Sequence, residues 1–228
     1  MSTYESVVVG ATGAVGSALV RELCASSRCT AVVAIVRRQT AAFDGVSGAD
    51  KIRQHVVDMA ELERETQKAA AGCSVAFCTM GIGQPSKVSK EELWKVDFEH
   101  ATAFARGCKA AGVQHISLLT AVAADSKSRS RYLHVKGAVE DAYRALGFAR
   151  TTLFRPSVLA TKNIRYGLQD RLTQSGFPLV SWILPSRFHE VSVEDLGRAM
   201  RVNAEREPGA DPVEVLHYAD FVALAKGG

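Results

Sequence analysis

The chain lacks the cysteine patterns of secreted and metal-bound proteins. Its five cysteines are an odd number, include no C-x-x-C pair and form no metal-type cluster with the six histidines. We interpret them as reduced thiols, mostly small buried residues, and predict no metal site. For Cys78, a chemical role is the alternative to a packing role, because a predicted strand ends there, next to an expected ligand.

Long apolar runs and a strong charge of one sign are also missing. The longest uncharged stretch, residues 69–86, contains glycines, Gln84 and Pro85, so we predict no transmembrane helix. Glu5 stands where a secretory signal would carry basic residues, and we expect the chain in the cytoplasm, with the nucleus as the alternative.

The 28 basic and 24 acidic residues leave a dispersed net charge of +4, too mild for a dedicated nucleic-acid or membrane surface. The charge balance does not exclude binding of small anionic ligands.

The 228 residues, 47% of them hydrophobic, predict one globular unit. Short β-branched runs alternate with longer amphipathic stretches, as in sheets whose parallel strands are joined by crossover helices. We predict strands at residues 6–10, 31–36, 52–57, 74–79, 113–119 and 151–154, and helices at 14–25, 61–71, 89–112 and 130–146. A polar loop at 39–50 replaces one crossover helix. This order predicts an α/β fold with a doubly wound parallel sheet.

After Pro156 the pattern is less regular. We predict helices at 162–174 and 194–204, an apolar segment with Trp182 at 178–185, and a short final strand and helix after a turn at 209–212. We expect elements within residues 157–228 to form a small C-terminal cap on the carboxyl ends of the strands, where such folds bind ligands.

Three glycines separate the first predicted strand from the first predicted helix, in Gly10-Ala-Thr-Gly13-Ala-Val-Gly16. Glycines there allow a tight turn, close approach of backbone amides to phosphate, and close packing of helix on sheet. The helix N-terminus adds positive potential. We therefore predict that a dinucleotide pyrophosphate binds here, rather than that the turn is merely structural. The residues predicted to hold it are Gly10, Thr12, Gly13, Ala14, Val15 and Gly16.

The end of the second strand indicates which dinucleotide binds. An NAD site usually has an acidic residue there for the ribose 2′-hydroxyl, but this strand ends in Arg37 and Arg38. Two guanidiniums suit a 2′-phosphate, so we predict NADP(H); the alternative is that both are solvated surface charges. Asp58, after the third strand, either accepts a hydrogen bond from adenine or caps the following helix.

Tyr132 and Lys136 lie four residues apart on one face of a predicted helix. A carbonyl that accepts hydride must also accept a proton, and a free phenol is poorly matched to neutral pH. A nearby ammonium would favour the phenolate and lower its pKa. We predict a catalytic pair, in which Lys136 could also hold the nicotinamide ribose. The alternative is an exposed pair without function.

A hydroxyl on the fifth strand would orient the substrate oxygen. Ser117 and Thr120 are the two candidates, and their spacing points them to opposite faces of the sheet. We select Thr120, which lies at the carboxyl end of the strand. His134 falls on another helix face than Tyr132 and is interpreted as a packing or surface residue.

These residues together resemble the extended, atypical short-chain dehydrogenases/reductases, most closely those of the Tat-interacting-protein type. The resemblance runs from Val7 to about Leu159. Beyond the glycine turn and Arg37-Arg38, it includes Val56-Val57-Asp58, Cys78-Thr-Met-Gly81, Leu118-Leu119, Tyr132-Leu-x-Val-Lys136-Gly137 with Glu140, and Phe154-Arg155-Pro156.

The resemblance implies a Rossmann fold, NADP binding, Tyr132 as proton donor and Lys136 as its partner. It also implies that Met80 and Gly81 contact the cofactor and that the segment from Arg155 through Pro156 to Val158 lines the nicotinamide pocket. One departure is the pair Thr120-Ala121, where relatives carry two serines. The hydroxyl must then come from Thr120, whose methyl group adds bulk.

Three classes of function follow. The first is an NADP(H)-dependent oxidoreductase that acts on a small carbonyl or alcohol between Tyr132, Thr120 and a cap with Trp182 and Phe188. The second is a regulatory protein that binds NADPH without catalysis and contacts protein partners. The third, nucleic-acid binding through Lys127-Ser-Arg129-Ser-Arg131, is disfavoured because no aromatic residues are interleaved there.

Overall fold

The computed structural model of the chain describes residues 2–157, 159–160 and 189–227. A seven-stranded sheet in the order β3-β2-β1-β4-β5-β6-β9 forms its centre, and all neighbouring strands are parallel. The strands are β1 (Tyr4–Val9), β2 (Cys29–Val36), β3 (Ile52–Val56), β4 (Val75–Cys78), β5 (His115–Leu119), β6 (Arg150–Phe154) and β9 (Val213–Leu216). The predicted doubly wound parallel sheet is confirmed.

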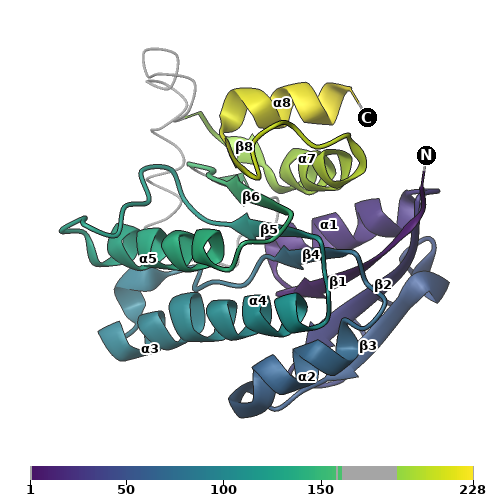
Figure 1. Cartoon of the computed structure of the whole chain (residues 1–228), viewed down its shortest axis with the longest axis horizontal. Helices are drawn as coiled ribbons and strands as arrows, with labels where there is room; N and C mark the ends of the chain where they lie inside the picture. Colours follow the sequence, from purple (N-terminus) through teal and green to yellow (C-terminus); the bar gives the residue numbers. More distant parts are fainter. Residues whose placement is uncertain (1, 158, 161–188, 228) are drawn as a thin grey trace.

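Helices cover both faces of the sheet (Figure 1). The helices α1 (Ala14–Ala25), α7 (Val193–Glu205) and α8 (Tyr218–Lys226) lie on one face; α2 (Leu62–Ala69), α3 (Lys90–Trp94), α4 (Ala101–Ala110) and α5 (Arg131–Ala145) lie on the other. Three short 3-10 turns are η1 (Ala49–Lys51), η2 (Met59–Glu61) and η3 (Pro85–Lys87), and a π-helical segment, η4, spans Lys95–His100. Two short strands, β7 (Leu159–Ala160) and β8 (Val191–Ser192), pair separately.

The strand β1, between β2 and β4, is buried on both faces, as parallel strands between two helical layers usually are. Val8 packs in the core beneath α1 with Leu19, whereas Val7 and Val9 pack in the core beneath α4 with Phe104. These five side chains are at most 3% exposed. Burial of each such side chain stabilises the fold by about 1.5–3 kcal/mol, so the hydrophobic runs of the sequence fix the position of β1.

The strand order reverses between β1 and β4. The chain builds β2 and β3 outward on one side of β1, then returns to build β4, β5 and β6 on the other side. In open α/β sheets, ligands bind outside the carboxyl ends of the strands at such a point. The glycine turn follows β1, and Met80 and Gly81 follow β4.

The connections agree with the predictions except within one helix. The segment 39–50 forms no α-helix, and its Phe43 is buried against the core beneath α1. Ser89 caps α3 as predicted, its hydroxyl accepting a hydrogen bond from the Glu92 amide at 3.0 Å. The predicted single helix at 89–112 is wrong in its middle, where η4 adopts wider π-helical winding. The spacing of hydrophobic residues along the sequence does not distinguish one π-helical turn from an α-helical turn.

The predicted cap is described only in part. Its helix at 194–204 is present as α7, which packs tightly on α1: a Cβ on Gly197 would lie 2.8 Å from the Leu19 amide nitrogen. This helix therefore belongs to the layer on the sheet rather than to a cap. The predicted elements at 162–174 and 178–185, with Trp182 and Phe188, lie outside the described residues.

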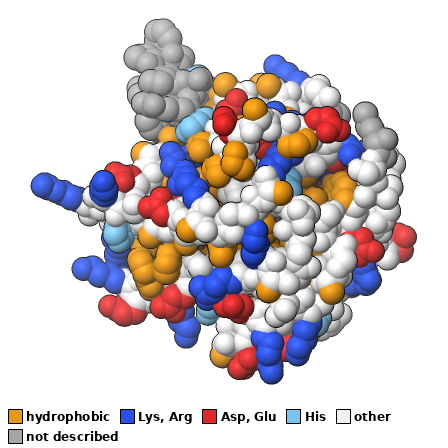
Figure 2. All heavy atoms as spheres, viewed as in Figure 1, with side chains coloured by type: hydrophobic (Ala, Val, Ile, Leu, Met, Phe, Trp, Pro, Cys, Tyr) orange, Lys and Arg blue, Asp and Glu red, His pale blue; other side chains and the backbone are white. Residues whose placement is uncertain are grey.

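Charged side chains of both signs are interspersed on the face in Figure 2, in keeping with the dispersed net charge. Within the described ranges, no helix combines the length and the apolar character that crossing a bilayer requires.

Candidate active site

At Gly10 and Gly16, the turn after β1 has no room for a side chain. Gly10 has φ +80°, and a Cβ on it would lie 2.6 Å from the Met80 amide nitrogen. A Cβ on Gly16 would lie 2.2 Å from the Gly10 carbonyl oxygen and 2.7 Å from Thr79 Oγ1. The turn therefore holds the ends of β1 and β4 and the start of α1 together, which only glycine permits here.

The N-terminus of α1 suits an anion. Gly13 is its N-cap residue and donates a hydrogen bond to the Gly10 carbonyl at 2.9 Å. In the described part of the chain, no side-chain oxygen caps this helix, and no acidic residue lies in its first turn. The amides of Ala14, Val15 and Gly16 thus face the turn without a carboxylate to oppose a phosphate, the usual arrangement for pyrophosphate binding. Thr12 lies exposed in the same turn.

Arg37 and Arg38 are exposed directly after β2. Val9 pairs with Ile35 across the two strands, so both arginines emerge beside the glycine turn. The position suits a phosphate clamp, and the alternative of plain surface charge stays open. Asp58 Oδ1 accepts a hydrogen bond from the Ala60 amide at 2.9 Å, which is the capping contact; a contact with adenine remains a prediction.

Lys136 forms a buried ion pair that the sequence analysis missed. Its Nζ lies 2.7 Å from Asp97 Oδ1, and the side chains are 7% and 0% exposed. The other carboxylate oxygen, Oδ2, accepts a hydrogen bond from the Ile82 amide at 2.9 Å. A Cβ on Gly81 would lie 3.1 Å from Asp97 Oδ1 and 3.2 Å from Lys136 Nζ. The glycine after β4 therefore leaves the space that the pair needs.

The pair keeps Lys136 charged. Burial alone would lower the pKa of this ammonium, but Tyr132 and the Asp97 carboxylate outweigh burial and raise the pKa above its usual value. An unpaired ammonium at this depth would be costly.

Tyr132 lies half-buried in the first turn of α5. Lys136 Nζ is 5.7 Å from the centroid of its ring, so the structure brings the predicted pair together on one helix face. Gly137 lets the preceding loop lie directly on α5, because a Cβ there would be 2.0 Å from the Ser126 amide nitrogen. This close packing fixes the helix that carries Tyr132.

Thr120 and Ser117 point to opposite sides of the sheet. Thr120 follows Leu118 by two residues, and Leu118 belongs to the core beneath α4 and α5, so Thr120 lies on the α5 side. Ser117 is in register with Phe77, whose side chain belongs to the other core. Thr120 is 4% exposed, and its Oγ1 has no hydrogen-bond partner among the described residues. A buried hydroxyl without a partner is what a ligand contact would leave in the free protein.

The segment after β6 is held by α5 and the loop after β5. The Arg155 side chain is bound to Glu140 of α5 and also donates to the Ala124 carbonyl at 3.3 Å. Pro156 is buried, and its carbonyl accepts a hydrogen bond from the Val122 amide at 2.9 Å. Val158 lies outside the described residues. The Arg155 side chain thus serves to hold α5 through Glu140. The contact of Pro156 with a nicotinamide stays a prediction.

The remaining candidates behave as packing residues. Cys78 is fully buried, and burial raises the pKa of its thiol, so it stays neutral. All five cysteines are free and buried, as predicted. The exposed His134 ring lies 6.2 Å from that of Trp94.

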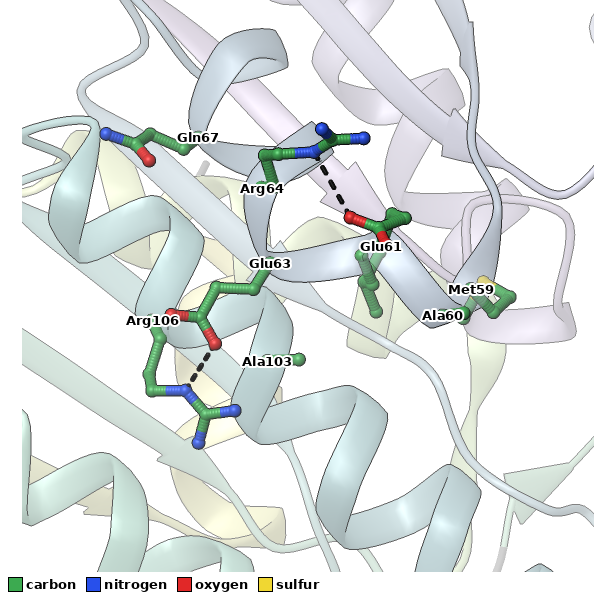
Figure 3. A pocket seen from close by; sticks show the side chains of 9 residues that line it. Met59, Ala60, Glu61, Glu63, Arg64, Gln67, Ala103 and Arg106 are labelled. Carbon is green, nitrogen blue, oxygen red and sulfur yellow. Dashed lines mark hydrogen bonds and ion pairs between the residues drawn. The ribbon is translucent and has the colours of Figure 1, made fainter.

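A groove of about 350 Å³ lies away from these residues, along η2, α2 and α4 (Figure 3). Ion pairs line it, from Arg106 to Glu63 at 2.6 Å and from Arg64 to Glu61 at 3.2 Å. It contains none of the predicted site residues, and we assign it no function.

Residues 10–178 match a family described as NAD(P)H-binding. The chain belongs to this NAD(P)H-binding family. Protein HTATIP2 of Rattus norvegicus is 30% identical over 228 residues, which cover 99% of this chain and 91% of that protein. The mitochondrial protein fmp52 of Emericella nidulans is 28% identical over 153 residues, which cover 67% of this chain and 66% of that protein. The HTATIP2 match confirms the resemblance that the motifs predicted.

Solved structures of the same fold include several redox proteins. The oxidoreductase ylbE of Lactococcus lactis is 16% identical with a TM-score of 0.68, covering 98% of this chain and 95% of that one. The triphenylmethane reductase of Citrobacter sp. is 20% identical with a TM-score of 0.64, covering 94% and 69%. At these identities the likeness establishes the fold alone.

Proposed function

We propose that this NAD(P)H-binding protein is an NADPH-dependent reductase of the short-chain type that acts on a small carbonyl compound. The observation that carries the proposal is the placement of Tyr132 beside the Lys136 ammonium, which itself lies against Gly81 at the end of β4. These two side chains lie at the carboxyl edge of the sheet, one strand from the glycine turn, where they would serve as proton donor and ribose-binding cation.

The residues at the carboxyl ends of the strands suit a dinucleotide. The open amides at the start of α1 would hold the pyrophosphate, Arg37 and Arg38 the 2′-phosphate, and Lys136 the nicotinamide ribose. When bound, the cofactor supplies the hydride. The absence of an acidic residue after β2 in the sequence supports NADPH over NADH.

The chain's own residues supply the rest of the chemistry. The Thr120 hydroxyl would orient the substrate oxygen through its free hydrogen-bonding capacity. Tyr132 would donate the phenolic proton to that oxygen as the carbonyl carbon gains hydride, which yields an alcohol and a phenolate. Lys136 would stabilise the phenolate until solvent returns the proton.

Two measurements test the proposal. Calorimetric titration with NADPH and NADH should give tighter binding of NADPH; a preference for NADH would refute the assignment of Arg37 and Arg38. With a panel of small carbonyl compounds, the wild type should consume NADPH, and Tyr132→Phe should lose turnover while it keeps cofactor affinity.

A non-catalytic NADPH-binding regulator is the second candidate. It is favoured by Thr120-Ala121, since the threonine methyl adds bulk where relatives carry serine. NADPH binding without consumption across the carbonyl panel, together with capture of a protein partner that depends on NADPH, would support it.

We propose the cytoplasm as the compartment of this protein. Because the fungal relatives are named mitochondrial, cell fractionation is the deciding measurement.

A further inference from the structure

Asp97 is a buried charged group at the site to which the proposed function gives no role. It comes from η4, between α3 and α4, and its carboxylate is completely buried. Its Oδ2 is held by the Ile82 amide, and its Oδ1 faces the Lys136 ammonium at 2.7 Å. A carboxylate held on both oxygens has one position, so its field at the neighbouring phenol is constant.

We propose that Asp97 sets the proton affinity of Tyr132 by cancelling the charge of Lys136. This inference rests on the proposed function for the role of Tyr132. A lone ammonium beside a phenol favours the phenolate. Here the ammonium is matched by a carboxylate at ion-pair distance, so the pair favours the phenolate less than a lone ammonium would. Weaker stabilisation of the phenolate suits donation of the proton, as in reduction of a carbonyl, more than oxidation of an alcohol.

The other ionisable groups around the pair do not replace this effect. Cys78, from β4, faces Lys136 but is a neutral thiol. On α5, the Arg131 side chain donates to the Pro85 carbonyl, and Glu140 is bound by Arg155. Within the described ranges, we therefore assign the local field at Tyr132 to the Asp97–Lys136 pair.

The test measures ionisation of Tyr132 in the full chain without cofactor, from the ultraviolet absorbance of tyrosinate during a pH titration. Each variant is paired with the same variant carrying Tyr132→Phe, so that the difference reports Tyr132 alone. Asp97→Asn should lower the midpoint by about one to two pH units, because the cation is then uncompensated. Lys136→Met should raise it, because the carboxylate is then alone.

The double variant Asp97→Asn/Lys136→Met is the decisive comparison. It removes a neutral pair and leaves no buried charge, so it should fold even where a single variant does not. Its midpoint should return to within about half a pH unit of the wild type. An unchanged midpoint in Asp97→Asn, or a double variant shifted as far as either single variant, would overturn the inference. Because no turnover is measured, these outcomes stay distinct from failure of the proposed reductase activity.

Discussion

The Arg155 guanidinium holds the Glu140 carboxylate through two hydrogen bonds, from Nε to Oε1 at 2.8 Å and from Nη2 to Oε2 at 2.5 Å. Glu140 is fully buried, and the hydrogen bonds to it raise the pKa of Arg155. This contact ties the end of β6 to α5, one turn after Lys136. The helix that carries the candidate catalytic pair is therefore anchored to the sheet by a bidentate ion pair.

Loss of this anchor should destabilise the fold. Among the described residues, Arg155→Ala leaves the buried Glu140 with the more distant Arg144, at 3.1 Å, and should lower the free energy of unfolding by about 3 kcal/mol. Arg144→Ala is the matched control: its side chain is 35% exposed, so the loss should stay below about 1 kcal/mol. Urea denaturation measures both, and equal losses would contradict the anchoring role.

Alanine in the glycine turn should abolish cofactor binding. In Gly16→Ala the new methyl would overlap the Gly10 carbonyl and push α1 away from β1, which separates the amides that would bind the pyrophosphate. We expect at least about a hundredfold weaker NADPH binding by calorimetry, equivalent to about 2.8 kcal/mol. Gly209→Ala is the control, since a Cβ there meets no atom within 4 Å. Wild-type affinity in Gly16→Ala would refute the site.

The paired arginines should discriminate between the two dinucleotides. Arg37→Ala/Arg38→Ala removes charge-assisted contacts worth about 1.5–3 kcal/mol each. NADPH affinity should fall by about a hundredfold or more, while NADH affinity stays within about twofold. The exposed Arg64 of α2 provides a control for the loss of an exposed arginine elsewhere on the surface, and Arg64→Ala should change neither affinity. Parallel loss for both dinucleotides would indicate a general electrostatic effect instead.

His115 should make the fold sensitive to acid. Burial, reinforced by the Arg150 charge, lowers the pKa of His115 to about 3, and its Nε2 lies 2.9 Å from Thr152 Oγ1. The unfolded chain binds this proton near pH 6.5 and the folded chain does not, so stability falls as the pH drops from about 6.5 towards 3. The slope from one proton is at most about 1.4 kcal/mol per pH unit.

Denaturation at several pH values measures this slope. Replacement of the ring in His115→Asn should reduce the slope over this window, whatever its effect on overall stability. His134→Asn changes an exposed ring and should keep the wild-type slope. An unchanged slope in His115→Asn would assign the acid sensitivity to carboxylates instead.

The parts of the molecule set by local pattern could be predicted from the sequence. The buried runs of β1 and β2, the glycine turn and the Ser89 cap each depend on neighbouring residues, and all are present in the structure. The ion pair of Asp97 with Lys136 joins residues 39 positions apart, through a turn whose winding the pattern does not encode.

One signal could have located Asp97. The buried positions Leu93, Asp97, Ala101, Phe104 and Cys108 form a single stripe along the helical segment. An acidic residue on an otherwise apolar stripe requires a buried partner. The sequence alone does not say which cation provides it, because that depends on how α5 packs against η4.

The wide turn of η4 has a consequence for how this family member can change over time. It accommodates an additional residue between α3 and α4, while the buried side chains of both helices stay on one stripe. Deletion of one residue there would rotate α3 by about 100° relative to α4, while α4 kept its place on the sheet. Loss of a single codon, with every other amino acid retained, would then be enough to separate the Asp97 carboxylate from the Lys136 ammonium.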